Sequence, residues 1–168
     1  MGVWKGRFSQ AILQHFPHVH MTLVDPWDGS DGGGVTDGTP ALLDRVKQEA
    51  LLNLSPFRDR VTILQCSSED GAGMVPDGSL DFAFIDARHD YPNVRADVRL
   101  WYPKVKPGGI VSGHDYIRRS RPTATHVVQA VQGYVYCYGI KPWFLLGSNA
   151  KVLGEIRDNS RSWFWVRL

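Results

Sequence analysis

The chain alternates short apolar runs with longer segments whose apolar residues recur every three or four positions. The short runs predict strands at 21–24, 61–64, 80–85 and 110–111. The longer segments predict helices at 8–16, 40–51, 94–101 and 127–134, the second with Thr39 as its N-cap and Pro40 at its first position. Strands alternating with helices indicate βαβ units, so the sequence predicts an α/β fold with a mostly parallel sheet.

The last quarter of the chain follows a different pattern. Short apolar runs joined by turns predict strands at 143–146, 151–156 and 162–168. Strands that follow one another through tight turns pair antiparallel. We therefore expect an antiparallel strand pair at the C-terminal end of the mostly parallel sheet.

Length and composition narrow the class of protein. With 168 residues, 43% hydrophobic and 21% charged, the chain is the size of one globular domain, 1–168. A net charge of +2 favours neither a nucleic-acid partner nor a membrane surface. No apolar run reaches the roughly 20 residues that span a bilayer, and the first ten residues lack a signal-peptide pattern, so we expect a cytoplasmic protein.

Acidic residues follow the predicted strands at the positions where α/β sheets bind ligands. Asp25, Asp86 and Asp115 each stand at or just after the end of a strand. A carboxylate such as Asp25 accepts two hydrogen bonds from the vicinal hydroxyls of a ribose. The alternative is that Asp25-Pro26 only ends a strand and starts a turn.

Two glycines four positions apart precede the first predicted helix, in the run Gly2-Val-Trp-Lys-Gly6. Glycine lets the backbone approach a ligand closely in a turn that leads into a helix. Asp25 follows about 20 residues later, which is the spacing of a nucleotide-binding fingerprint. The two features together predict a nucleotide-like cofactor.

Four motifs carry a resemblance to a known family. They are Gly2-Val-Trp-Lys-Gly-Arg-Phe-Ser9, Leu23-Val-Asp-Pro-Trp27, Phe84-Ile-Asp-Ala-Arg-His-Asp-Tyr91 and the run from Trp101 through Lys106-Pro-Gly-Gly109 to Gly113-His-Asp-Tyr116. The chain resembles the class I S-adenosylmethionine-dependent methyltransferases, and within them the family 24 methyltransferases, which are similar to small-molecule O-methyltransferases. The resemblance runs from Gly2 to about Tyr116 and implies a Rossmann-like, doubly wound sheet.

The resemblance implies a cofactor site for S-adenosylmethionine. Gly2 and Gly6 would cradle its methionine part, and Asp25 would bind the ribose hydroxyls. Further contacts are implied for Trp27 near the adenosine, for Cys66 and Ser67 at the adenine, and for Asp86.

A second group of residues points to catalysis. Carboxylates and imidazoles at neighbouring strand ends could hold a divalent cation that lowers the pKa of a substrate hydroxyl. In metal-dependent relatives of the resembled family, acids matching Asp86 and the pair His114-Asp115 bind magnesium, so the implied metal ligands are Asp86, His114 and Asp115. Histidine at the first position of the pair departs from that pattern. The site could therefore hold Mg²⁺, a softer divalent ion, or no ion.

The implied catalytic residues are Asp86, His89 and His114, and one of the two imidazoles would take the proton from the substrate hydroxyl. The alternative is that Asp86 only contacts the cofactor.

These features favour O-methylation of a small-molecule acceptor. Two alternatives stay open: a nicotinamide-dependent Rossmann oxidoreductase, which Asp25 fits equally well, and a catalytically inactive methyltransferase-like binding module. The expected partner is the small-molecule acceptor. A second copy of the chain, in a homodimer, is a further hypothesis.

One departure from the family concerns its central strand. In the resembled family the first glycine follows the central strand of the sheet, which ends in an acidic residue. Here only Met1 precedes Gly2. We therefore expect the first central strand to be missing, which would leave two halves of the sheet with unpaired edges.

Overall fold

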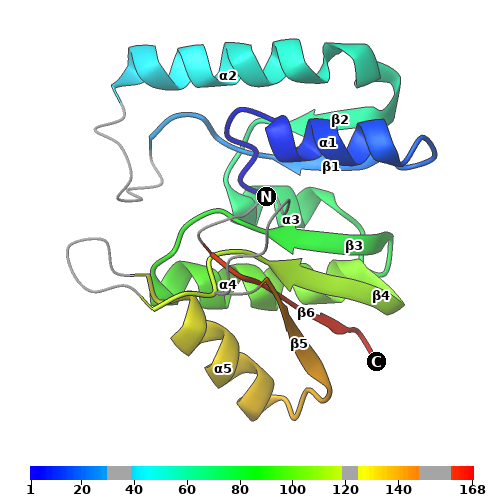
Figure 1. Ribbon diagram of the computed structural model, residues 1–168, viewed down its shortest axis with the longest axis vertical. Coiled ribbons are helices and arrows are strands. Elements are labelled where there is room, and N and C mark those ends of the chain that lie inside the picture. The colour runs from blue at the N-terminus through cyan, green and yellow to red at the C-terminus, as the bar shows by residue number, and fades with distance from the viewer. Residues whose placement is uncertain (30–38, 119–124, 148–159) are drawn as a thin grey trace, which may run out of the picture. The chain divides into compact units, whose positions relative to one another are not determined.

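The computed structural model describes residues 1–29, 39–118, 125–147 and 160–168, shown as ribbons in Figure 1. The chain divides into two compact units, Met1–Gly71 and Ala72–Leu168. Each unit is described by itself below. The single domain expected from the chain length stays a prediction.

Unit 1 is built on a parallel strand pair. Its elements in chain order are α1 (Arg7–His15), β1 (Met21–Val24), α2 (Pro40–Leu54), the 3₁₀ turn η1 (Ser55–Arg60) and β2 (Val61–Leu64). β1 and β2 pair in parallel, with Met21 opposite Val61. Thr39 caps α2 as predicted: its Oγ1 accepts a hydrogen bond from Leu42 N at 3.3 Å, and Pro40 opens the helix.

The core of unit 1 lies where the helices meet the strand pair (Figure 1). Its buried side chains come from the N-terminal turn, both helices, β1 and the segment after it: Val3, Leu13, Leu23, Trp27, Val46, Ala50 and Leu54. The apolar spacing that predicted α2 is the face that this core buries. In α1 only Leu13 of the predicted apolar face lies in the core, whereas Phe8 and Phe16 are exposed.

Unit 2 contains a four-stranded sheet in the order β3-β4-β6-β5. Its elements are β3 (Leu80–Ile85), α4 (Tyr91–Trp101), η2 (Tyr102–Lys104), β4 (Val105–Gly113), α5 (Val127–Cys137), β5 (Trp143–Leu146) and β6 (Ser162–Val166). β3 and β4 are parallel, whereas β6 runs antiparallel to both β4 and β5. The predicted antiparallel pair at the C-terminal end is thereby confirmed.

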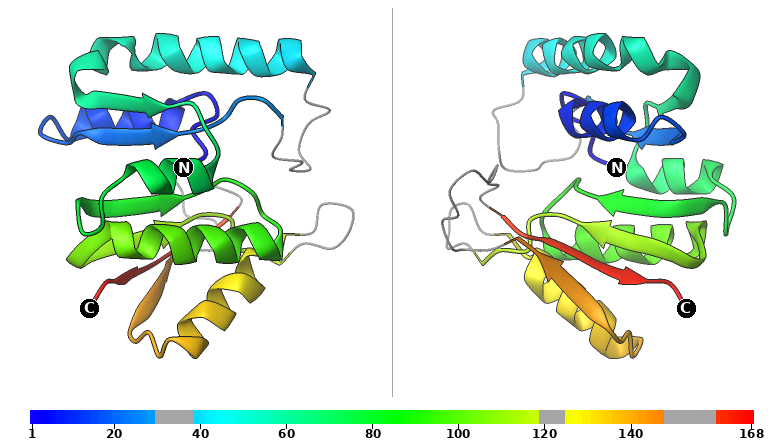
Figure 2. Two further views of the ribbon diagram at one scale, coloured as in Figure 1. Left: turned by 180° about the vertical axis from the view of Figure 1, so that it is seen from behind. Right: turned by 45° about the vertical axis from the view of Figure 1, so that its right-hand side comes forward.

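Helices α4 and α5 pack side by side over one face of this sheet (Figure 2). Beneath them Trp163 and Trp165 are fully buried and stacked, with ring centroids 5.0 Å apart. Val98 of α4 and Val131 of α5 are fully buried as well. Large apolar side chains from two helices and from β6 therefore hold the unit together.

The structure confirms the α/β class and extends several predicted elements. β4 covers Val105–Gly113, longer than the predicted 110–111, because the glycine-rich run 107–109 belongs to the strand. α3 (Ser68–Met74), which contains the boundary between the units, was not predicted because two glycines interrupt its apolar pattern. The predicted strand 151–156 lies outside the described residues.

The expected unpaired edges are present in each unit. In the described part of the chain, β1 pairs only with β2, and β3 pairs only with β4, so each is an edge strand of its sheet. No helix among the described residues is long and apolar enough to cross a membrane.

Candidate functional site

The glycine turn of unit 1 has the conformation that its sequence requires. Gly2 and Gly6 adopt φ angles of 76° and 70°, and Trp4 between them adopts 50°. Gly6 N donates to Val3 O at 2.8 Å, and α1 begins directly after Gly6. A Cβ on Gly6 would lie 3.3 Å from the Leu54 side chain, so this position needs glycine both for its φ angle and for the close approach of α2.

The carboxylate of Asp25, which follows β1, binds the backbone of this turn. Its Oδ2 accepts hydrogen bonds from Val3 N at 2.8 Å and Trp4 N at 2.9 Å, and its Oδ1 accepts one from Trp27 N at 3.0 Å. The structure thus brings together the glycine turn and the acid that sequence spacing had linked. A carboxylate has about four acceptor positions, so three amides leave little room for two ribose hydroxyls unless they share these positions. The ribose role of Asp25 stays a prediction.

Three other residues implied in cofactor binding, Trp27, Cys66 and Ser67, lie in unit 1, whereas Asp86 lies in unit 2. Trp27 is buried in the core, and its Nε1 donates to Trp4 O at 3.0 Å. Ser67 caps α3, accepting from Asp70 N at 3.1 Å and donating to Asp70 Oδ2 at 2.7 Å. Burial and the Asp70 charge raise the pKa of the Cys66 thiol, so it is protonated at neutral pH.

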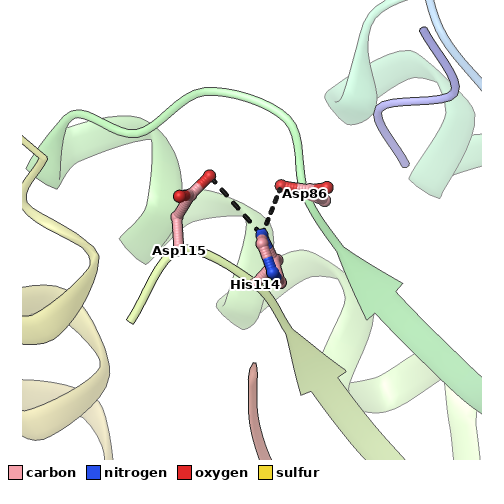
Figure 3. Close-up of side chains that lie close together, drawn as sticks. All are labelled: Asp86, His114 and Asp115. Atoms are coloured by element: carbon pink, nitrogen blue, oxygen red, sulfur yellow. Dashed lines mark ion pairs between the residues drawn. The ribbon is translucent and has the colours of Figure 1, made fainter. Parts of the chain in front are cut away.

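Unit 2 gathers the second group of predicted residues at the carboxyl ends of two adjacent parallel strands (Figure 3). Asp86 directly follows β3, and His114 and Asp115 directly follow β4. His114 Nδ1 lies 4.0 Å from Asp86 Oδ1 and 3.7 Å from Asp115 Oδ2. His89, in the loop after β3, places Nε2 2.8 Å from Asp115 Oδ2 and 3.6 Å from Asp86 Oδ1.

This group, which we call the acid–imidazole cluster, consists of Asp86, His89, His114 and Asp115. Its side chains are partly buried, with exposed fractions from 16% for His114 and Asp115 to 34% for Asp86. Asp86, His89 and His114 of the cluster line a hollow with a volume of about 10 Å³. That volume is about the space of one bound water and far below the ~300 Å³ of the smallest ligand pockets, so this hollow alone would hold an ion or a single small functional group.

Charge within the cluster shifts two pKa values in opposite directions. The pKa of His89 rises to about 9 because Asp115, and then Asp86, stabilise the imidazolium against the opposing effect of burial. Burial would raise the pKa of Asp115, but hydrogen bonding to His114, His89 and Ser160 outweighs it and holds this pKa well below its usual range. At neutral pH His89 is therefore a proton donor in this arrangement.

We expect nuclear magnetic resonance to find a pKa of about 9 for His89. Because this pKa lies above the ~6.5 of an unfolded histidine, the ion pairs of His89 stabilise the fold fully below pH ~6.5 and lose their effect as the pH rises through 9. Asp115→Asn should move the pKa of His89 back toward 6.5. An unchanged pKa in that variant would show that the pairing with Asp115 does not cause the shift.

Sequence reasoning missed two residues that donate hydrogen bonds to members of the cluster. Ser160 Oγ donates to Asp115 Oδ1 at 2.7 Å, and Trp163 Nε1 donates to His114 O at 3.2 Å. Both residues are more than 40 positions from their partners, and no local motif marks them. Only the antiparallel pairing of β6 with β4 brings them to the site.

The cluster offers a donor set suited to a divalent cation. One ligand atom each from Asp86, His114 and Asp115 lies within 4.8 Å of the others. Ligand atoms bound to one ion at about 2.1 Å lie roughly 3 to 4 Å apart, so small side-chain movements would complete the site. Two carboxylates and one imidazole fit magnesium less closely than ions such as Mn²⁺ or Zn²⁺.

Comparison with known proteins agrees with this fold. Residues 1–116 match the family model described as a methyltransferase domain, and the chain belongs to this family of class I S-adenosylmethionine-dependent methyltransferases. Among curated proteins it is similar to the uncharacterized protein y4gI of Sinorhizobium fredii, with 24% identity over 108 residues that make up 64% of this chain and 11% of that protein.

Solved structures share the fold. The O-methyltransferase NovP superposes with a TM-score of 0.64 at 22% identity, covering 99% of this chain and 69% of NovP. An O-methyltransferase family protein from Burkholderia thailandensis gives 0.63 at 14% identity, covering 98% of this chain and 48% of that one. Cofactor-bound Rv0187 from MTB superposes with a TM-score of 0.64 at 16% identity, covering 99% of this chain and 70% of Rv0187. The chain spans about half the length of the Burkholderia protein and about a tenth of y4gI.

Proposed function

We propose that this chain transfers the methyl group of S-adenosylmethionine to a hydroxyl oxygen of a small-molecule acceptor. The observation that carries this proposal is the acid–imidazole cluster, in which two carboxylates and two imidazoles meet at the ends of β3 and β4. An oxygen acceptor must lose a proton, and this group of residues can accept and stabilise it. The O-methyltransferases with the same fold support an oxygen acceptor.

Unit 1 supplies the cofactor contacts in this proposal. The turn Gly2–Gly6 has a glycine with a positive φ angle at each end, and the Asp25 carboxylate holds the turn by accepting hydrogen bonds from Val3 N and Trp4 N. A fixed turn binds the charged methionine end of the cofactor without first having to become ordered. The proposed cofactor-binding residues are Gly2, Gly6, Asp25, Trp27, Cys66 and Ser67 of unit 1, together with Asp86 of unit 2.

A divalent cation fits the cluster and would be held by Asp86, His114 and Asp115. Such an ion, when bound, lowers the pKa of a coordinated hydroxyl and orients it. Its positive charge would take over the role that the His89 imidazolium plays between the two carboxylates.

Methyl transfer itself forms one bond and breaks one. The acceptor oxygen attacks the methyl carbon as the bond from that carbon to the sulfonium sulfur breaks, and the hydroxyl proton passes to a base. Because His89 is protonated at neutral pH in this arrangement, His114 is the better candidate for the base when no cation is bound to its imidazole. Asp86, 4.0 Å from His114 Nδ1, would stabilise the imidazolium that forms.

Binding of S-adenosylmethionine, measured by calorimetry, tests the cofactor site. We expect Asp25→Ala to weaken binding at least ~10-fold, because the turn loses the carboxylate that accepts three amide hydrogens. Asp59→Ala is the matched control, since the Asp59 side chain, in η1, is 94% exposed. A wild-type protein that gives no heat with the cofactor would refute the cofactor assignment.

The two alternative functions give different results in the same assay. The match to a methyltransferase family argues against a nicotinamide-dependent oxidoreductase, and binding of NADH in place of S-adenosylmethionine would restore that alternative. Cofactor binding without turnover against a library of hydroxylated acceptors would favour the inactive binding module. A homodimer, the remaining partner hypothesis, is tested by light scattering.

A further inference from the structure

One short segment, Ser160–Trp163, contacts each of the four residues at the C-terminal end of β4. These are Gly113, the last residue of the strand, and the three residues that follow it, His114, Asp115 and Tyr116. Gly113 pairs with Trp163 across the antiparallel ladder, and His114 O accepts from Trp163 Nε1 at 3.2 Å. Asp115 Oδ1 accepts from Ser160 Oγ at 2.7 Å, and Tyr116 N donates to Arg161 O at 2.9 Å. The segment thus fixes the backbone and one side chain of the strand end that carries two predicted metal ligands.

Asp115 depends on such support more than its neighbours do. Its φ angle is 53°, in the left-handed region that non-glycine residues adopt at a cost of about 1 to 2 kcal/mol. A residue in this region keeps its conformation only where surrounding contacts hold it. The hydrogen bond from Ser160 supplies the contact at the carboxylate.

The hydrogen bond from Ser160 Oγ also gives the two carboxylate oxygens of Asp115 different partners. Oδ1 faces the Ser160 hydroxyl, whereas Oδ2 faces His89 at 2.8 Å and His114 at 3.7 Å. A carboxylate held through one oxygen presents the other in a fixed direction. Groups that hydrogen-bond a ligand in this way typically change metal affinity by 10- to 100-fold when they are removed.

We propose that Ser160 is a positioning residue that orients Asp115 so that Oδ2 faces a divalent cation shared with Asp86 and His114. This inference rests on the metal-assisted form of the proposed function. Ser160 lies outside residues 1–116, the part of the chain that matches the family model. The orientation of a ligand inside the family motif thus depends on a hydroxyl supplied by the C-terminal segment.

Titration of the whole chain with Mn²⁺, followed by calorimetry and by the electron paramagnetic resonance signal of the bound ion, tests this inference. We expect Ser160→Ala to weaken Mn²⁺ binding by about 10- to 100-fold. Ser160→Thr keeps the hydroxyl and should restore near wild-type affinity and the wild-type spectrum. Ser79→Ala is the matched control, because it removes another hydroxyl of unit 2, one that donates to Pro76 O at 2.8 Å.

The outcomes separate this inference from the function on which it rests. If wild-type protein binds Mn²⁺ and Ser160→Ala binds it equally well, the positioning role is wrong while metal assistance stands. If Ser160→Thr binds as weakly as Ser160→Ala, the hydroxyl is not the cause and the inference is likewise wrong. If wild-type protein binds S-adenosylmethionine but no Mn²⁺, both metal assistance and the positioning role fail, and the cofactor assignment stands.

Discussion

Replacing Asp115 with asparagine should lower the affinity for a divalent cation at least ~100-fold and abolish any dependence of methyl transfer on that ion. Asparagine has nearly the same shape and tolerates a left-handed backbone, so the φ angle of 53° is retained. The Ser160 hydroxyl can still donate to the side-chain oxygen of asparagine. The substitution therefore removes the negative charge while leaving the local structure in place.

The loss should be large because asparagine removes a full negative charge from one of the three predicted ligands. The pKa of Asp115 lies well below the usual range, so at neutral pH this residue carries a full charge that both His89 and His114 face. Binding of Mn²⁺ measured by calorimetry and release of S-adenosylhomocysteine with and without the ion check this prediction. Asp81→Asn is the matched control, since Asp81 is an exposed residue of β3 that pairs with Lys106. An ion dependence that survives in Asp115→Asn and in Asp115→Ala would exclude Asp115 as a ligand.

Gly113→Ala should destabilise unit 2 by about 3 kcal/mol or more, which is the upper range for overpacking in a well-packed interior. A Cβ at Gly113 would overlap Ile85 O and would lie 2.7 Å from Trp163 Cε2. The backbone cannot withdraw from either contact, because Gly113 pairs with Ile85 of β3 on one side and with Trp163 of β6 on the other. The ring of Trp163 is fully buried and has no room to move.

Urea unfolding followed by tryptophan fluorescence measures this loss. Gly73→Ala is the matched control in α3, where a Cβ would meet no atom within 4 Å; we expect it to be neutral or to stabilise by up to ~1 kcal/mol. Because Gly113 directly precedes His114 and Asp115, Gly113→Ala should also weaken divalent-ion binding. A Gly113→Ala variant as stable as Gly73→Ala would show that the packing around β4 is looser than the structure indicates.

The candidate site was predictable from the sequence where its residues stand at the ends of strands. Asp86 and the pair His114-Asp115 follow apolar runs flanked by turn residues, and the carboxyl ends of adjacent parallel strands meet at one edge of a sheet. The glycine turn and Asp25 were linked by spacing in the same way, and hydrogen bonds from Val3 and Trp4 to Asp25 join them in the structure.

Other features could not be predicted, because they depend on partners distant in the chain. The three amides that occupy the Asp25 carboxylate come from both sides of β1, and the pairing of His89 with Asp115 requires the loop after β3 to fold over the end of β4. Helix α3 was missed because Gly71 and Gly73 weaken its pattern, although Ser67 followed by Glu69 and Asp70 is a helix start that could have revealed it.

The sequence by itself determined the α/β class and the residues at the strand ends, because strand ends and turns depend on residues within a few positions of each other. Only the tertiary structure decided which of those residues interact. The raised pKa of His89 follows from its contacts with Asp115 and Asp86 at the ends of β4 and β3. The direction of the Asp115 carboxylate and the contribution of Ser160 follow from the register between β6 and β4. That register depends on packing of Trp163 and Trp165 against two helices, which no local pattern specifies.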